Sequence, residues 1–181
     1  MSADFAAARL NMLDSQVRPA DVTDWALQDA IGADKGFAAY ADAEVEYAPG
    51  RWLLRPRDVA KLLQHLRPRA GERALAIAAP YAALVLEAMG LTVDRIDGED
   101  LSAVTGSNYD VIIVEGAVAK APAAWTAALA QGGRLGVVER SGPAGKATLY
   151  VRAEDGVGAR PVFEATPPYL AGFEPVPGFA F

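Results

Sequence analysis

The chain has 181 residues, of which 52% are hydrophobic and 22% are charged, and its formal net charge at pH 7 is −6. This composition can bury a substantial core, which excludes a disordered chain and favours one domain over residues 1–181. The negative charge argues against a protein that binds the phosphate backbone, so no nucleic-acid partner is expected. Cysteine is absent and His65 is the single histidine, which excludes thiolate zinc sites and histidine-only metal sites.

Targeting signals are not evident. No apolar run approaches the roughly 20 residues that cross a bilayer, and the N-terminus lacks a clear apolar signal core. We therefore expect a cytoplasmic protein with no membrane partner.

The first 56 residues predict a cap that precedes the sheet. Residues 1–35 have helical stretches, with one break at Arg18-Pro19, because proline disfavours a helical residue before it. Thr23 or Asp21 could cap the second helix. Residues 38–54 indicate a loop or short strands around the turn dipeptide Pro49-Gly50.

Residues 57–181 predict the sheet and its helices. Val59, Leu62, Leu63 and Leu66 recur with helical spacing, which predicts a helix over residues 57–66. The apolar run 74–79 indicates a strand covered on both faces. Residues 80–89 predict a helix that begins at a proline, and residues 91–96 predict a short strand.

A second strand, helix and strand follow at residues 109–114, 122–130 and 134–138. Alternation of this kind predicts an α/β fold with a mostly parallel sheet. Residues 147–152 and 161–163 could add one or two further antiparallel strands. Residues 142–146 lack the spacing of a phosphate loop and indicate a hairpin-like turn.

In an open α/β sheet, ligands bind beyond the carboxyl ends of the strands, where the strand order switches. The loops to examine are therefore residues 78–81, 97–100, 115–119 and 139–146.

Three segments resemble bacterial protein-L-isoaspartate O-methyltransferases in order and spacing. They are residues 11–19 (Asn-Met-Leu-Asp-Ser-Gln-Val-Arg-Pro), 109–117 (Tyr-Asp-Val-Ile-Ile-Val-Glu-Gly-Ala) and 132–135 (Gly-Gly-Arg-Leu). The similarity runs through most of the chain. It implies a Rossmann-like S-adenosylmethionine-dependent methyltransferase fold, whose members methylate the carboxylate of isoaspartyl residues in damaged proteins.

The resemblance also implies where a cofactor would lie. The positions that match are Ala78, Ala79, Tyr81, Asp97 and Glu115, with Asp97 at the place of the acid that holds the ribose hydroxyls. The family has an acidic residue and a glycine-rich turn after the first sheet strand, whereas residues 75–81 here contain neither. Alanine and proline add β-carbons, and proline removes an N–H donor. Loss of two hydrogen bonds at roughly 1 to 3 kcal/mol each would lower the affinity by about one to four powers of ten.

This sequence departs from the family pattern at two further places, which are the stretch before Tyr109 and the loop before residue 57. About a dozen residues separate Asp97 from Tyr109, too few for the helix and strand that the family has there, so the sheet is expected to be shortened by about one helix and strand. Its exposed edge could pair in a homodimer. The loop before residue 57 has no serine or threonine, although Arg51 or Arg55 could attract a substrate carboxylate.

Two functional hypotheses remain open. One is weak S-adenosylmethionine-dependent methyl transfer to isoaspartyl carboxylates of a protein substrate, in which the site mainly positions the reactants. The other is a catalytically silent pseudo-methyltransferase that acts as a binding or assembly module for a protein partner. A nucleotide-dependent oxidoreductase is excluded because G-x-G-x-x-G is absent. No catalytic residue and no metal ligand is assigned.

Overall fold

The computed structural model describes residues 42–176, and the helices expected in residues 1–35 lie outside the described residues. The described part begins with a small hairpin, in which β1 (Val45–Ala48) pairs antiparallel with β2 (Arg51–Leu53). These are the short strands that the Pro49-Gly50 turn predicted. Gly50 forms the turn with a φ of +67°, a conformation that glycine adopts without steric strain.

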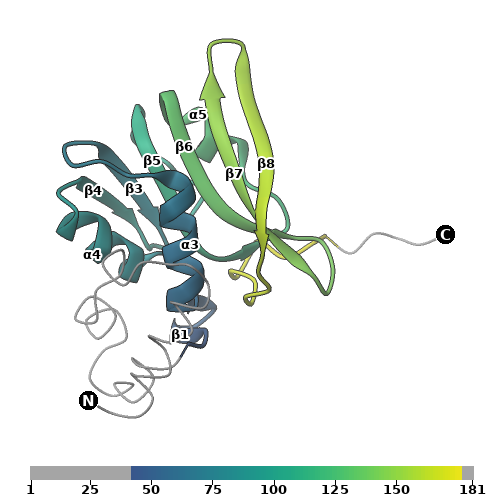
Figure 1. Ribbon diagram of the computed structural model, residues 1–181. Helices are drawn as coiled ribbons and strands as arrows, with labels where there is room; N and C mark the ends of the chain where they lie inside the picture. Colours follow the sequence, from purple (N-terminus) through teal and green to yellow (C-terminus); the bar gives the residue numbers. More distant parts are fainter. Residues whose placement is uncertain (1–41, 177–181) are drawn as a thin grey trace.

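In the described part of the chain, the main sheet contains six strands in the order β4-β3-β5-β6-β7-β8. The neighbouring pairs among β4, β3, β5 and β6 are parallel, and β7 and β8 continue the sheet antiparallel (Figure 1). The strands are β3 (Arg73–Ile77), β4 (Thr92–Ile96), β5 (Tyr109–Val118), β6 (Leu129–Arg140), β7 (Gly145–Ala153) and β8 (Gly156–Glu164). This mostly parallel sheet confirms the predicted fold class.

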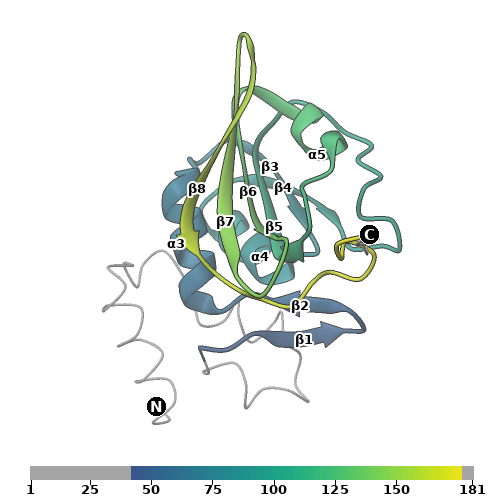
Figure 2. The same ribbon diagram turned by 90° about the vertical axis from the view of Figure 1, so that its right-hand side faces the viewer.

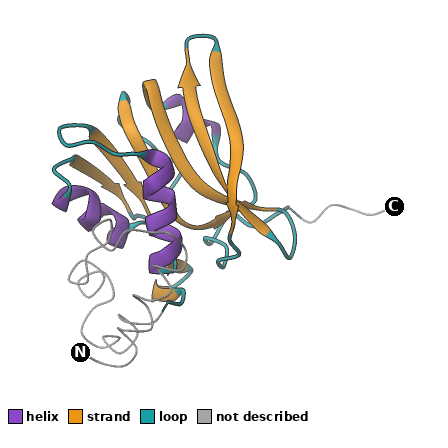
Figure 3. Ribbon diagram, viewed as in Figure 1, coloured by secondary structure: helices purple, strands orange, loops and turns teal. Residues whose placement is uncertain are grey.

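Helices cover both faces of the sheet (Figures 2 and 3). α3 (Pro56–Leu66) and α4 (Pro80–Ala88) contribute to one hydrophobic cluster, and α5 (Ala123–Ala127) contributes Trp125 to the cluster on the other face. The predicted apolar stripe of α3 is buried as expected. Each parallel strand therefore has apolar neighbours on both sides, which explains the near-continuous hydrophobic run of β5.

The structure differs from the sequence prediction after β5. The helix expected over residues 122–130 ends at Ala127, and β6 begins at Leu129, which pairs with Tyr109 of β5. Pairing with an already ordered strand overrides the helical propensity of these alanines. Residues 97–108 contain only turns and irregular backbone, so β4 is an edge strand among residues 42–176. The predicted shortening of the sheet is confirmed.

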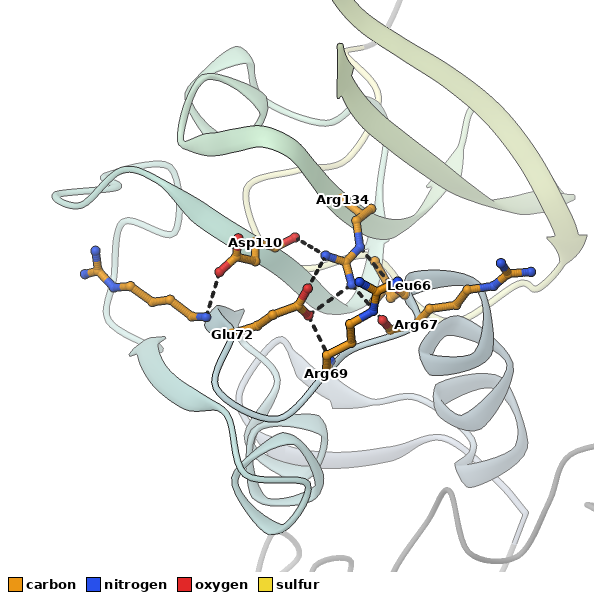
Figure 4. A network of polar contacts seen from close by, with 7 residues as sticks. Leu66, Arg67, Arg69, Glu72, Asp110 and Arg134 are labelled. Carbon is orange, nitrogen blue, oxygen red and sulfur yellow. Dashed lines mark hydrogen bonds and ion pairs between the residues drawn. The ribbon is translucent and has the colours of Figure 1, made fainter.

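A polar network joins the amino ends of the strands (Figure 4). The guanidinium of Arg134 donates hydrogen bonds to the carbonyl oxygens of Leu66 and Arg67 at 2.8 Å, and to the carboxylate of Glu72 at 2.9 Å. Burial raises the pKa of Glu72, but these hydrogen bonds outweigh it and hold that pKa below its usual range. The network ties α3 to β6 at the edge of the sheet away from the predicted ligand crevice.

Candidate functional site

The switch in strand order lies at β3. This strand pairs with β4 on one side and with β5 on the other, and the chain passes from β4 across β3 to reach β5. The crevice at which such sheets bind ligands is therefore at the carboxyl ends of β3 and β5. Ala78, Ala79 and Tyr81 follow the end of β3. Glu115, expected in a loop over residues 115–119, lies instead within β5, which continues to Val118, and its hydrogen bond to Ala82 brings it to the same crevice.

The turn after β3 adopts a left-handed conformation without a glycine. Ala78 has a φ of +46°, and its N–H donates to the carbonyl oxygen of Ile96 at 2.8 Å. A left-handed conformation costs roughly 1 to 2 kcal/mol for a residue with a β-carbon. Pro80 then begins α4, and Ala78, Ala79 and Tyr81 are all buried. Packed alanines therefore form this bend, and no glycine takes part in it.

Glu115 is fully buried at the end of this crevice. One carboxyl oxygen, Oε1, accepts the N–H of Ala82 in the first turn of α4 at 2.9 Å, and Oε2 accepts the N–H of Leu54, just after β2, also at 2.9 Å. The first turn of a helix has free N–H groups and a positive dipole end, which together favour an acidic group. One side chain from β5 therefore joins β5, α4 and the segment after β2.

The environment of Glu115 changes its protonation. Burial, together with the negative charge of Asp97, raises the pKa of this carboxyl to about 8, although the hydrogen bonds from Ala82 and Leu54 act in the opposite direction. At neutral pH the protonated form is therefore favoured, and the group bridges the three segments chiefly as a neutral acid.

Asp97 is held by the β1–β2 hairpin, which crosses the carboxyl ends of the strands (Figure 2). The Tyr47 hydroxyl donates to Oδ1 of Asp97 at 2.8 Å, and Nε of Arg51 lies 3.8 Å from the same oxygen. Arg51 also donates to the carbonyl oxygen of Gly98 at 2.7 Å. Burial and the bond to Asp97 raise the pKa of Tyr47, so its hydroxyl stays protonated and donating. Asp97 and Arg51, predicted to hold different ligands, are brought together as an ion pair.

Arg55 does not join them. Its Nε lies 2.9 Å from the carboxylate of Glu44, and no contact to Asp97 or Glu115 is present. The two arginines predicted to attract a substrate carboxylate thus each face a carboxylate of the protein itself.

A small pocket of about 50 Å³ lies beside Asp97. Drug-sized ligands occupy pockets of roughly 300 to 1,000 Å³, so this space would hold a fragment of a nucleoside. Its walls are formed by Ala76, Ala79, Pro80, Arg95, Ile96 and Asp97.

Residues 168–173 close the far side of the crevice. The N–H of Ala117 donates to the carbonyl oxygen of Pro168 at 2.9 Å, and the N–H of Leu170 donates to the carbonyl oxygen of Ala117 at 2.8 Å. Gly116 has a φ of +103°, and a β-carbon there would lie 2.7 Å from the side chain of buried Leu170.

No pattern in the sequence had indicated a role for residues 168–173 or for Tyr47 at this site. Glu115 could have been noticed because it is an acidic residue that directly follows the apolar run of β5. It is predicted from the sequence only as a position that could contact a cofactor.

The described residues contain neither a candidate metal site nor a candidate membrane-spanning helix. Within residues 42–176, no three His, Asp or Glu side chains are grouped so as to hold a metal ion. No helix in the same region is long and apolar enough to span a membrane.

Comparison with known proteins gives a consistent assignment. No family model matches the chain. A protein-L-isoaspartate O-methyltransferase of Methylorubrum populi is 31% identical, with 79% of this chain and 84% of that protein covered. A solved structure of a putative protein-L-isoaspartate O-methyltransferase from Plasmodium falciparum, in complex with S-adenosyl-L-homocysteine, matches 93% of this chain and 99% of its own with a TM-score of 0.67 at 14% identity. A second structure of that enzyme type matches 93% of this chain and 67% of its own with a TM-score of 0.69 at 16% identity.

Proposed function

Because the chain belongs to the protein-L-isoaspartate O-methyltransferase family, we propose that it is a member whose cofactor crevice is closed by its own side chains, and that it acts as a binding or assembly module. The observation that carries this proposal is the buried carboxyl of Glu115, which accepts the N–H groups of Ala82 and Leu54. S-adenosylmethionine binds with negligible affinity, and methyl transfer to isoaspartyl carboxylates is lost.

A cofactor that entered this crevice would have to displace hydrogen bonds that the protein makes with itself. A ligand that used the first turn of α4 would break the hydrogen bond between Ala82 and Glu115 and would leave one oxygen of that buried carboxyl without a partner. An unsatisfied buried group costs roughly 1 to 3 kcal/mol, so this loss lowers the affinity by about one to two powers of ten. The β-carbons of Ala78 and Ala79 also remove space at the bend. The residues at the crevice therefore do not fit the cofactor.

Calorimetric titration of the full chain with S-adenosylmethionine tests the proposal. We expect no binding heat and no rise in the thermal unfolding temperature at millimolar cofactor, whereas a ligand at about 100 times its Kd would add about 2.7 kcal/mol of stability. A matched assay follows methyl transfer to a peptide that contains one isoaspartyl residue. Micromolar binding, or measurable transfer that depends on the isoaspartyl residue, would refute the proposal.

Residual enzyme activity is the second candidate function, and Asp97 favours it. The side chain of Asp97 is 44% exposed and borders the small pocket after β4, where an acid could accept the ribose hydroxyls of S-adenosylmethionine. Under this alternative the Tyr47–Asp97 bond opens when the cofactor binds. Any cofactor affinity should then fall in Asp97→Asn and rise in Tyr47→Phe, while the first proposal predicts no binding in either variant.

A further inference from the structure

A second, larger pocket of about 500 Å³ lies at the opposite side of the sheet from β4, around the turn between β6 and β7. Its size is in the range of pockets that hold ligands. None of the candidate residues at the crevice lines it. The lining residues used below are Lys120, Glu139, Lys146, Thr148, Ala159 and Pro161.

Glu139 is fixed in orientation at this pocket. Its Oε1 accepts the N–H of Ala121 at 2.9 Å and the hydroxyl of Tyr150 at 2.5 Å. Burial and this bond raise the pKa of Tyr150, so the hydroxyl remains a donor. A preset carboxylate here can accept N–H groups from a ligand.

Two lysines supply positive charge beside it. Lys120 and Lys146 are exposed, and neither forms an ion pair with any residue in the described range 42–176. Lys146 lies directly opposite Glu139 in the pairing of β6 with β7, and cross-strand neighbours share a face of the sheet. The pocket therefore combines two free cations with one oriented carboxylate.

Arg160 lines the same pocket but its charge lies elsewhere. It pairs with Leu149 of β7, which belongs to the hydrophobic cluster on the α3 face, and its charge lowers the pKa of His65 in α3. The guanidinium is thus on the face that α3 covers. Lys61 in α3 and Arg67 at the carboxyl end of that helix do not line the pocket, so they offer a matched control pair for Lys120 and Lys146.

The edge strand β8 borders the pocket through Ala159 and Pro161. Within the described part of the chain, β8 pairs only with β7. Residues 156–161 of this strand are exposed, and Val157 is 41% exposed. An exposed edge presents backbone groups to which an extended peptide can pair, and Pro161, which lacks an N–H, limits that pairing to a short stretch.

We propose that this pocket binds an extended acidic segment of a partner protein. Carboxylate side chains of the segment pair with Lys120 and Lys146, its backbone lies along β8, and one of its N–H groups reaches Glu139. A compact multivalent anion is disfavoured because Glu139 repels it, whereas a peptide carries both carboxylates and N–H donors. The inference uses none of the crevice residues, so it stands whether or not S-adenosylmethionine binds.

Fluorescence anisotropy of the full chain with labelled short peptides tests this proposal. The probe alternates glutamate and valine, and its counterpart alternates lysine and valine. We expect the acidic peptide to bind, with an affinity that falls as salt rises, and the basic peptide to bind at least about tenfold more weakly. In Lys120→Ala/Lys146→Ala the affinity for the acidic peptide should fall about tenfold or more, since two charge pairs are lost.

The control variant Lys61→Ala/Arg67→Ala removes the same charge on the α3 side, away from the pocket, and should leave that affinity within about twofold. Amide chemical shifts should move at Lys120, Glu139 and Ala159 when the acidic peptide is added. Equal losses in the two double variants, preference for the basic peptide, absence of binding at millimolar peptide, or shifts confined to α3 would each overturn the proposal. Circular dichroism of both variants verifies that the fold is retained.

Discussion

The side-chain carboxyl of Glu115 and the backbone N–H of Ala82 are 2.9 Å apart, although 33 residues separate them in the sequence. Their hydrogen bond crosses the switch point of the sheet and joins β5 to the first turn of α4. The second carboxyl oxygen bonds to Leu54, which is 61 residues away. The first turn of α4, which the fold places at the ligand crevice, is thus hydrogen-bonded to the side chain of Glu115.

Removal of this carboxyl should destabilise the protein strongly. In Glu115→Ala the N–H groups of Ala82 and Leu54 lose their acceptor in a buried site, and we expect a loss of about 2 to 5 kcal/mol in the free energy of unfolding. Glu115→Gln keeps one acceptor and should lose about 1 to 3 kcal/mol. Urea unfolding followed by circular dichroism measures both values. The exposed Glu99→Ala is the control and should change stability by less than about 0.5 kcal/mol; an equal effect at both positions would contradict the assigned role.

The stability of the protein should fall as pH rises toward 8. The pKa of Glu115 is about 8 in the folded protein, whereas the pKa of an exposed glutamate carboxyl is 4.5. Between these values the folded state holds a proton that the unfolded state has released, so the unfolding free energy decreases with pH, by on the order of 4 kcal/mol across the window.

Urea unfolding at pH 5, 6, 7 and 8 checks this sign, with Glu115→Gln as the reference. The buried Asp58, whose pKa burial also raises, and His65, whose pKa burial lowers, are both retained in the variant. The difference between the two proteins therefore isolates Glu115. If the wild-type and variant profiles ran parallel, Glu115 would titrate outside this window.

The left-handed Ala78 predicts an unusual tolerance of glycine. Ala78→Gly relieves a conformation that costs roughly 1 to 2 kcal/mol, which offsets the lost methyl burial and the greater freedom of the unfolded chain. We expect a change of less than about 1 kcal/mol in the unfolding free energy. The matched control is Ala76→Gly in β3, which has no left-handed conformation to relieve and should lose about 1.5 kcal/mol or more. Equal losses in a thermal or urea melt would show that Ala78 carries no strain.

The network around Arg134 predicts that lysine cannot replace arginine there. The guanidinium donates to three carbonyl oxygens, those of Leu66, Arg67 and Asp110, and to the carboxylate of Glu72. A lysine ammonium lacks the planar arrangement of donors, so Arg134→Lys should lose about 2 to 3 kcal/mol. Arg67→Lys, an exposed change nearby, should lose less than about 0.5 kcal/mol in the same urea titration. Equal stability of Arg134→Lys and the wild type would make the network dispensable.

The order of the elements was predictable because the forces that select them are local. Apolar spacing in α3, the apolar runs of β3 and β5, and the proline at the start of α4 each depend on neighbours within a few residues. The family resemblance was predictable from residues 11–19, 109–117 and 132–135, and the shortened sheet from the short stretch between Asp97 and Tyr109. The end of α5 was not, because Leu129 pairs with Tyr109 of β5, and strand pairing is decided by a partner outside the segment.

The sequence by itself determined which residue types stand at the crevice, including the absence of glycine in the turn after β3 and the acid at position 115. Only the tertiary structure decided what those residues do. Ala78 bends into the left-handed region because β3, β4 and α4 hold it there, and Glu115 bonds to two N–H groups that come from distant parts of the chain. Contacts of this kind depend on how packed elements are arranged in space, and no local pattern of residues encodes which buried donor an acid will meet.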